Sequence, residues 1–368
     1  MSVLPSDIVV YGSANMPEAD GTINGGAVDF SRRVAFYDIA PAGTLDVIST
    51  SPSDTATKIT FYGRDATGVI QSQTLSLNGQ TWVSGSQSLE RLLYAALSGA
   101  TANGPAANPG GTPAVGDVAL AAHGAVLPTG SVTTDATVRT AQSGSVNHAG
   151  TTPPLFKLQA GDGASVSPGQ VIWIRSGTGA NQLRQIIATS GYGTDVTAVS
   201  RDWTTIPDNT STYKIFQGML FEISPNPVTA VIRIFSSTAA DGPTGAQRTY
   251  YEKVFAVNNN TGTALTGAQI EVASETPSMP SGALLDLALT TALNDTGTIA
   301  NRQIAPSSGV GSFSTQPTFV AVSGPGNLPP GAAPNAAGAQ GIWLRLTLPP
   351  GAASYKGSAD IRVQGTTT

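Results

Sequence analysis

Short runs of alternating apolar and polar residues, each closed by a turn signal, are the feature of this sequence that most restricts its fold. Residues 59–62 lead into the polar segment 63–68, and residues 69–77 then alternate until Asn78-Gly79. A period of two places successive side chains on opposite faces of a strand, and Asn-Gly is a preferred turn pair. These two runs therefore predict a β-hairpin.

Runs of this kind recur through the middle and last thirds of the chain. They cover residues 155–158, 170–174, 185–188, 195–199, 212–216, 230–235, 251–257, 268–272, 342–348 and 360–363. The spacing of about 8–12 residues between turns in the middle third is typical of a β-sandwich or small barrel. Residues 284–293 fit a helical stripe and a buried strand almost equally, and their β-rich surroundings favour a strand.

One segment near residue 90 predicts a helix instead. Its apolar residues recur at helical spacing and a glycine follows them: Leu89, Leu92, Leu93, Ala96, Leu97 and then Gly99. Such a stripe is typical of an amphipathic helix that ends at the glycine. We therefore expect a short helix at about residues 87–98, packed on a small sheet.

The sequence thus predicts a mainly β protein with two or three β-sandwich or barrel-like domains and one short helix in the N-terminal domain. Residues 100–130 are rich in Ala, Gly and Pro, which is typical of a linker or an extended loop. The expected domains are an N-terminal β-domain at 1–99, a middle β-domain at 131–217 and a C-terminal β-sandwich at 218–368.

Charged residues are unusually scarce in this chain of 368 residues. Lys and Arg number 18 and Asp and Glu number 23, so 11% of the residues are charged, against about 25% in ordinary soluble domains. Surfaces with so little charge are poorly soluble unless neighbouring molecules cover them. This composition favours a subunit of an assembly, and the 40% of hydrophobic residues is ample for a core.

Composition also excludes several classes of function. The chain has no cysteine, so thiolate metal sites, disulfides and cysteine nucleophiles are absent, and its two histidines leave little room for histidine chemistry. A net charge of −5 without a basic run argues against sequence-specific nucleic-acid binding. No apolar run is long enough to span a membrane, and the first residues lack the pattern of a secretory signal.

The motifs that would indicate an enzyme are weak. Gly177-Thr-Gly179 and Gly191-Tyr-Gly193 lack the third glycine of a dinucleotide-binding loop and fit hairpin turns better. A Ser-His-Asp triad stays open because serines are common, but there is no Gly-x-Ser-x-Gly elbow. We interpret both histidines, His123 and His148, as loop residues.

Acidic residues give equally weak evidence for a catalytic or metal site. The carboxylate pairs that a glycosidase would need are represented by Asp202 with Asp208 and Asp286 with Asp295, which all lie among turn residues. A calcium-like site near Asp162 or within 258–260 has no EF-hand spacing, and 258–262 is most simply a hairpin loop. We therefore expect no catalytic residue, no cofactor and no metal site.

Large aromatic residues are the best candidates for structural anchors. The four that we single out as core or interface anchors are Trp173, Trp203, Tyr213 and Trp343. Trp173 and Trp343 lie inside apolar strands, which favours core packing over sugar stacking.

Three regions of the sequence resemble structural proteins of tailed bacteriophages. The first comprises Gly177-Thr-Gly-Ala-Asn-Gln-Leu-Arg-Gln-Ile-Ile187 together with Val196-Thr-Ala-Val-Ser-Arg-Asp-Trp-Thr-Thr-Ile-Pro-Asp-Asn-Thr-Ser-Thr-Tyr-Lys-Ile215. It is similar to a β-element that recurs in those proteins. The start of the chain, 11–20 with 25–29, and the late segment 340–351 are similar to virion proteins in the same way. The resemblance implies a virion component and transfers no catalytic residue.

The resemblance and the composition together predict a structural subunit that assembles with itself and with other virion proteins, and that is found in the virion after assembly in the bacterial host cytoplasm. Tail tube, neck and capsid-decorating roles all stay open. The alternative is a host-recognition fibre or spike that binds carbohydrate, and a polysaccharide hydrolase is a further alternative. No membrane partner is expected.

Overall fold

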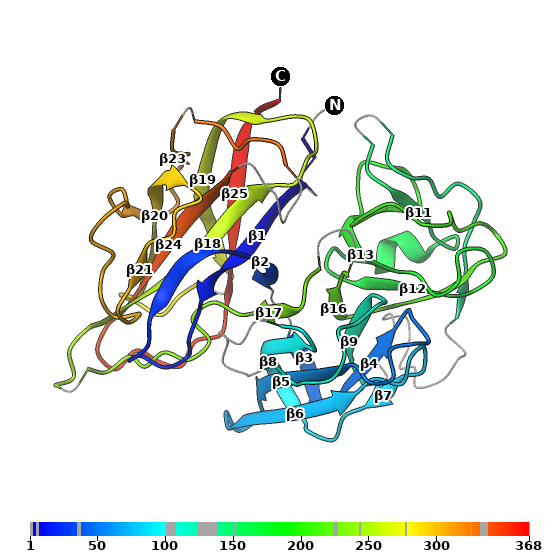
Figure 1. The fold of residues 1–368 in the computed structure, drawn as a ribbon, viewed down its shortest axis with the longest axis horizontal. Helices are drawn as coiled ribbons and strands as arrows, with labels where there is room; N and C mark the ends of the chain where they lie inside the picture. Colours follow the sequence, from blue (N-terminus) through cyan, green and yellow to red (C-terminus); the bar gives the residue numbers. More distant parts are fainter. Residues whose placement is uncertain are drawn as a thin grey trace. The chain divides into compact units, whose positions relative to one another are not determined.

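The computed structural model describes all residues except 1–2, 5–6, 35–37, 101–107, 124–137, 150–151, 224–226, 243, 277, 325, 332–337 and 368. The chain forms two compact units (Figure 1). Unit 1 comprises Met1–Phe36, Thr101–Ala107 and Val231–Thr368, and unit 2 comprises Tyr37–Ala100 and Asn108–Ala230. The boundary at residue 230 falls inside strand β17 (Ala230–Ile232).

Both units are built from antiparallel β-strands, which confirms the predicted mainly β fold class. The helical element whose bounds lie wholly within the described residues is the short 3₁₀ turn η3 (Asp162–Ser165). No helix in the described part of the chain is long and apolar enough to cross a bilayer.

Unit 1 contains a large sheet with the order β22-β20-β24-β18-β1-β2, and β21 pairs with β2. Its strands are β1 (Ile8–Asn15), β2 (Asn24–Val34), β18 (Arg248–Asn258), β20 (Leu284–Leu293), β21 (Thr298–Ile299), β22 (Ser314–Thr315) and β24 (Ala339–Leu348). Residues 284–293 form a strand, as predicted. A second sheet has the order β23-β19-β25, from β23 (Val320–Ala321), β19 (Leu265–Thr276) and β25 (Ser358–Thr367).

Strand β18 lies in the middle of the large sheet of unit 1 and is buried over most of its length. It pairs with β24 on one side and with β1 on the other. Tyr11, Phe255, Val257 and Ala339 form one buried cluster on these strands. Strands paired on both edges and covered on both faces favour continuous apolar runs, as in the segment 254–257.

Unit 2 contains three groups of strands. One group has the order β8-β5-β6, with β3 on β8; another is β16-β9-β4-β7; and the third is β10-β15-β12-β13-β14-β11. The first two groups use β3 (Asp38–Gly43), β4 (Leu45–Ser49), β5 (Lys58–Arg64), β6 (Ile70–Ser76), β7 (Val83–Ser84), β8 (Leu89–Leu97), β9 (Val118–Ala122) and β16 (Gly218–Phe221). The third uses β10 (Arg139–Thr140), β11 (Leu155–Lys157), β12 (Val171–Ser176), β13 (Leu183–Ala188), β14 (Val196–Val199) and β15 (Thr212–Phe216).

The predicted hairpin of residues 59–77 is present as β5 and β6, which pair from Lys58↔Ser76 to Arg64↔Ile70. The glycine pairs at 177–179 and 191–193 lie in the turns that follow β12 and β13, and all four glycines have positive φ angles. Glycine is favoured at such positions because it has no Cβ. The interpretation of both segments as hairpin turns is confirmed.

The predicted helix at 87–98 is wrong, because these residues contain strand β8. Its burial explains the error: Leu89 and every residue from Leu92 to Leu97 are buried, so both faces of the strand are covered. A strand buried on both faces loses the alternation that identifies strands, and its apolar residues then also match a helical stripe. Strand β8 pairs with β5 on one side and β3 on the other.

The two units do not follow the predicted domain boundaries of 1–99, 131–217 and 218–368. Residues 1–36 belong to unit 1 with the last third of the chain, because β1 pairs with β18 across more than 200 residues of sequence. The predicted linker at 100–130 lies partly outside the described residues. Within it, Val118–Ala122 is strand β9, whose first four residues are buried. Local composition carries no signal for such long-range pairing.

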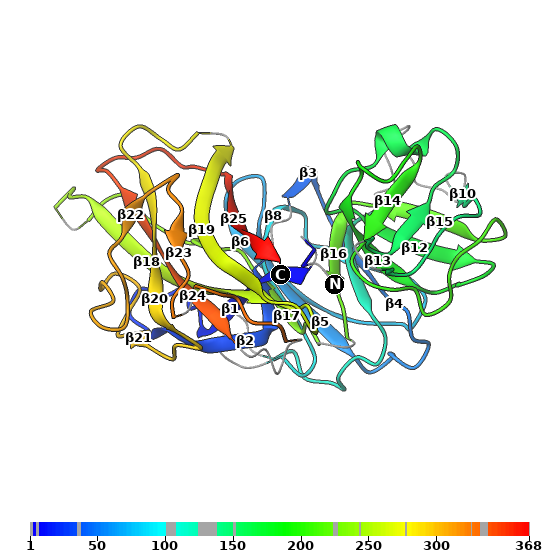
Figure 2. The ribbon, with the colours of Figure 1, turned by 90° about the horizontal axis from the view of Figure 1, so that it is seen from above.

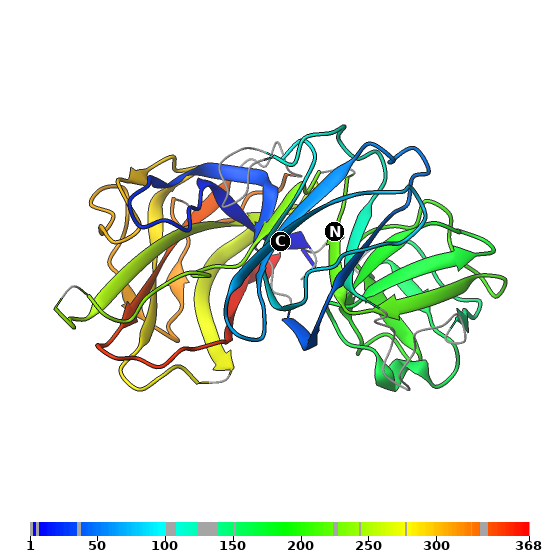
Figure 3. The ribbon, with the colours of Figure 1, turned by 90° about the horizontal axis from the view of Figure 1, so that it is seen from below.

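Figures 2 and 3 show the strands of each unit from two opposite sides. In unit 2, one core cluster gathers Phe156, Ile172, Ile186, Trp203 and Tyr213 from the six-stranded sheet. A second cluster joins Ile48 and Leu220 from the β16-β9-β4-β7 sheet to Val171 and Leu183. The two sheets therefore share an apolar interface, and a charged cluster lies beside it.

Candidate functional site

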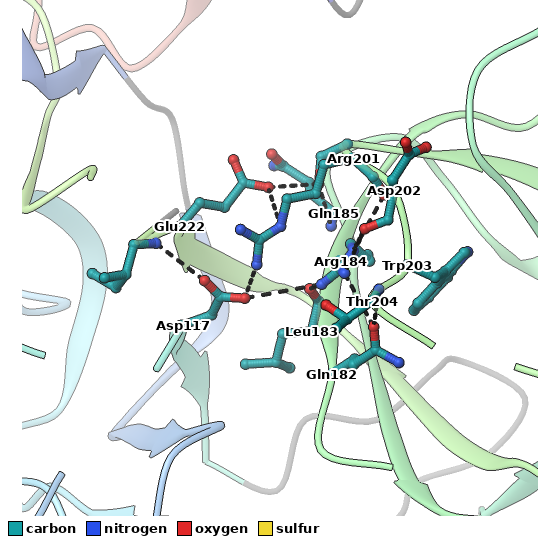
Figure 4. Close-up of polar contacts among 12 residues, drawn as sticks. Asp117, Gln182, Leu183, Arg184, Gln185, Arg201, Asp202, Trp203, Thr204 and Glu222 are labelled. Carbon is teal, nitrogen blue, oxygen red and sulfur yellow. Dashed lines mark hydrogen bonds and ion pairs between the residues drawn. The ribbon is translucent and has the colours of Figure 1, made fainter. Parts of the chain in front are cut away.

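Four charged side chains lie together in the described part of unit 2 and form the arginine–carboxylate cluster, which we define as Asp117, Arg184, Arg201 and Glu222 (Figure 4). Asp117 immediately precedes β9 and Glu222 immediately follows β16. Arg184 lies on β13, and Arg201 lies two residues after β14. The cluster thus draws its anions from one sheet and its cations from the other.

Strand register brings the two carboxylates together. Strands β16 and β9 are antiparallel with Phe221 opposite Val118, so the next pair in register is Glu222 and Asp117. Carboxylates on directly opposite residues repel each other, and both side chains are only 9% exposed. Two such anions are stable at this depth only when cations compensate them.

The two arginines provide that compensation. Arg201 donates from Nη2 to Asp117 Oδ2, and its Nε lies 3.8 Å from Glu222 Oε1. Arg184 Nη1 lies 3.9 Å from Asp117 Oδ2. Further hydrogen bonds complete the carboxylates: the Ile223 amide donates to Asp117 Oδ1 at 3.1 Å, and Ser200 Oγ donates to Glu222 Oε1 at 2.7 Å.

Arg184 is the most deeply buried member, with a side chain only 3% exposed. Its Nη1 donates to the Leu183 carbonyl at 2.6 Å, and its Nη2 donates to the Asp202 carbonyl at 2.6 Å. Its Nε contacts the carbonyls of Arg201 and Asp202 at 3.2 and 3.1 Å. Burial lowers the pKa of Arg184 to about 10, against the opposing effect of the Glu222 and Asp202 charges, so the guanidinium stays charged at neutral pH.

Neighbouring residues hold the guanidinium in place. Gln182 Oε1 accepts from Arg184 Nη2 at 3.2 Å and from the Thr204 amide at 2.7 Å. The ring of Trp203 lies under the guanidinium at 5.0 Å, and its indole Nε1 donates to the Leu155 carbonyl at 3.1 Å. The planar fork of arginine suits this combination of stacking and several carbonyl acceptors.

The contacts of the arginine–carboxylate cluster indicate a structural role and not a catalytic one. Two cations meet two anions, and the contacts above occupy both carboxylates and the guanidinium of Arg184. A general acid or base needs a group that is free to exchange a proton with a substrate. This arrangement instead fixes the end of the β9–β16 pair against β13 and the loop that follows β14.

Unit 1 contains a second buried charge, Lys253 on β18, whose side chain is fully buried. Its Nζ donates to the Asp295 carboxylate, to the Gly26 carbonyl at 2.9 Å and to the Gly297 carbonyl at 3.1 Å. The ring of Trp343 lies 5.6 Å from Nζ. Desolvation lowers the pKa of Lys253, and the bond to Asp295 opposes this shift. Lys253 therefore joins β2 to the loop at 295–297.

Glu252, the preceding residue on β18, points to the other face and is also buried. Its Oε2 accepts from Asn24 Nδ2 at 2.8 Å, and its Oε1 lies 3.9 Å from Arg302 Nη1. Desolvation raises the pKa of Glu252 to about 8, although the Asn24 bond and the Arg302 charge act in the opposite direction. Asn24 Oδ1 is a buried acceptor without a partner in the described structure.

The four predicted anchors lie in different places. Trp203, Tyr213 and Trp343 are at most 2% exposed, whereas Trp173 is only partly buried and packs edge to face with Trp82 at 5.8 Å between ring centroids. Trp203 and Tyr213 both contact the ring of Phe156, so the structure brings these two together in one core. Trp343 lies in unit 1 and packs with Tyr251 and Ile299.

Among the described residues, Ser84, His123 and Asp46 are the residue types of a catalytic triad and lie together, but with the wrong geometry. His123 Nδ1 lies 2.8 Å from Asp46 Oδ2 and 3.3 Å from Ser84 Oγ. A triad needs the carboxylate on one ring nitrogen and the nucleophile on the other, whereas here both contact the same nitrogen. His148 is exposed, and its backbone amide donates to Asp202.

The candidate acidic residues serve separate structural contacts. Asp208 accepts from the Thr210 amide and hydroxyl within its own turn, which lowers its pKa. Asp286 pairs with Arg345 across β20 and β24, and Asp162 accepts from the Tyr213 hydroxyl at 2.8 Å. Within the described residues there is no group of three or more His, Cys, Asp or Glu side chains placed to hold a metal ion. Residues 259–264 lie between β18, which ends at Asn258, and β19; because these two strands belong to different sheets, the predicted hairpin loop at 258–262 is wrong.

Sequence reasoning did not single out the arginine–carboxylate cluster, Glu252 or Lys253. Adjacent charges inside the apolar run 250–257 are the available signal for the last two, because neighbouring residues on a strand face opposite sides and one of them must point inward. Asp117 and Arg184 carry a weaker signal, since each is a single charge beside an apolar run.

Comparison with known proteins adds no assignment: no family model matches the sequence, and no curated protein or solved structure shows significant similarity to it.

Proposed function

We propose that this chain is a structural subunit of a tailed-bacteriophage particle, which assembles with itself and with other virion proteins through its β-sheets. The observation that carries the proposal is that several charged side chains are buried in contacts within the chain. In a chain with 11% charged residues, the arginine–carboxylate cluster and Lys253 place charged side chains where they brace loops and sheets.

Inward-facing charge has a direct consequence for the surface. Interfaces between subunits are depleted of charge at their centre, since desolvating an ion costs free energy that a neutral surface does not require. A subunit that buries some of its few charges in internal contacts carries still less charge on the surface that other copies can cover. The resemblance of residues 177–215 to phage structural proteins supports the same role, and the virion is the location that this role implies.

The test is the assembly state of the purified full-length chain. Size-exclusion chromatography with light scattering across a concentration series, followed by negative-stain electron microscopy, should show rings, tubes or defined oligomers. A chain that stays monomeric up to its highest soluble concentration would contradict the proposal.

A carbohydrate-binding fibre is the alternative that a specific observation favours. Trp82 and Trp173 are both partly exposed, pack against each other, and have Arg175 5.3 Å from the Trp173 ring. Aromatic faces beside a polar group are suited to sugar rings. Binding on a glycan array that is lost in Trp173→Ala, with unchanged far-UV circular dichroism, would support this function.

A further inference from the structure

Strand β25 (Ser358–Thr367) is an edge strand of unusual length. It lies at the end of the sheet order β23-β19-β25 and pairs with β19 from Leu265↔Thr367 to Thr276↔Ser358 (Figure 2). Among the described strands only β19 pairs with it. In an antiparallel strand about half of the backbone N–H and C=O groups point away from the partner, so β25 offers a row of them on its outer edge.

Two usual protections of an edge strand, short length and proline, are missing from β25. It has ten residues and no proline, and the two register shifts in its pairing place their extra residues in β19. Ala359, Ile361 and Val363 alternate with the more exposed Asp360, Arg362 and Gln364. The two-residue periodicity needed for a further ladder is therefore intact.

The sequence of β25 is complementary to itself. When a strand pairs antiparallel with its own copy about a two-fold axis, one residue lies opposite itself, and its neighbours on either side lie opposite each other. With Ile361 at the centre, Asp360 of each copy lies opposite Arg362 of the other. Opposite residues in such a pair point to the same face, so this register forms two cross-strand pairs of opposite charge.

We propose that β25 pairs antiparallel with β25 of a second copy of this chain, in register about Ile361. This inference rests on the proposed function, because it names the surface through which copies assemble. Neighbouring registers are disfavoured: centring on Asp360 or on Arg362 would place like charges directly opposite each other.

The charges of β25 are available for this contact. The Arg362 side chain is 59% exposed and lies 3.2 Å from Glu271 on β19, its partner in register. Asp360 is exposed, lies opposite Ala273 and has no ion-pair partner among the described residues. In the proposed dimer each Arg362 would lie between Glu271 of its own chain and Asp360 of the other copy.

The other long edge strand, β6 (Ile70–Ser76), has no charge pattern that would select one register of self-pairing. Its residues are exposed at alternate positions, but none of the seven is charged. Nothing in its sequence favours one register of self-pairing over another. The inference is therefore specific to β25.

Cysteine cross-linking gives a direct test, because the chain has no cysteine of its own. Ile361→Cys places two thiols opposite each other across the two-fold axis, where the Cα separation of an antiparallel pair falls in the range that a disulfide accepts. Mild oxidation should give a disulfide-linked dimer. Ser358→Cys is the matched control, since residue 358 would lie opposite 364: it should cross-link when mixed with Gln364→Cys and not by itself. Equal cross-linking of the two single variants by themselves would overturn the register.

Charge reversal tests the same register without a covalent bond. Asp360→Arg and Arg362→Asp each place two like-charged pairs in the dimer, and each should weaken self-association at least about tenfold. Mixing the two variants restores both opposite-charge pairs, so a heterodimer should form with an affinity near that of the wild-type dimer. Thermal melts of each variant establish that it is folded, and Asp360→Arg changes only an exposed residue.

The outcomes separate this inference from the proposed function. If the wild-type chain assembles while Ile361→Cys does not cross-link and Asp360→Arg does not weaken assembly, β25 is not the interface, and the structural role stands. If the wild-type chain remains monomeric at every concentration, both proposals fail.

Discussion

Replacing Arg184 by methionine tests whether the arginine–carboxylate cluster braces unit 2. Methionine keeps a similar length and an apolar stem but removes the charge and every donor. The carbonyls of Leu183 and Asp202 would lose the guanidinium, and Asp117 would lose one of its two ion pairs and keep Arg201.

The magnitude follows from burial. Removing one partner of a buried ion pair costs about 3–5 kcal/mol, since the remaining charge stays desolvated without compensation. Arg184 is 3% exposed and Asp117 is 9% exposed, so solvent screening reduces this value little. The loss of the Arg184 hydrogen bonds adds less free energy than the sum of the individual bonds, because Gln182 Oε1 still accepts from the Thr204 amide. We therefore expect a loss of about 3–5 kcal/mol in the free energy of unfolding of unit 2.

Tryptophan fluorescence during urea unfolding is the appropriate assay. Three of the four tryptophans, Trp82, Trp173 and Trp203, lie in unit 2 and report on its unfolding. In a thermal melt the same loss corresponds to about 6–20 °C for a unit of this size. The matched control is Arg64→Met, whose guanidinium makes an exposed contact to the Gly68 carbonyl and should cost less than about 1 kcal/mol. Equal effects of the two substitutions would refute the bracing role.

Three further predictions concern unit 1. Trp343→Ala should destabilise the protein by about 3–5 kcal/mol in urea unfolding, because the ring is 1% exposed on a central strand; a change in melting temperature below about two degrees would contradict this. Lys253→Met should cost about 2–4 kcal/mol, since it leaves the Asp295 carboxylate and the Gly26 carbonyl without their cation, and Asp295→Asn in the same background should recover part of the loss. Glu252→Gln should be more stable than the wild type at pH 9 and lose that advantage towards pH 5. The pKa of Glu252 is raised to about 8 in the folded state, so the folded protein binds the extra proton, and the stability of the wild type falls as the pH rises from the ordinary carboxyl range through about 8. If the melting temperatures of the wild type and of Glu252→Gln change in parallel across this pH range, Glu252 is charged in the folded state.

Much of the β structure was predictable from local sequence. The hairpin at 59–77, the strand at 284–293 and the turns at 177–179 and 191–193 each carry their own signal, either a period of two or glycines where φ is positive. Strand β8 was the exception, because covering both of its faces removed the alternation on which the prediction depends.

The candidate sites were less accessible to sequence reasoning. Asp117 and Arg184 lie 67 positions apart in the chain, and only the β9–β16 register and the packing of β13 bring them together. The aromatic anchors fared better, because a large apolar ring favours burial wherever the chain places it: Trp203, Tyr213 and Trp343 are buried, and only Trp173 remains partly exposed.

The sequence by itself determined that the chain forms short strands separated by glycine-rich turns and that it has no cysteine chemistry, because backbone geometry and side-chain inventory are local properties. Only the tertiary structure decided which strands pair, that residues 1–36 join the last third of the chain, and which of the few charges lie buried against each other. The physical reason is that strand pairing and desolvation depend on neighbours in space, and the sequence separates those neighbours by tens to hundreds of residues.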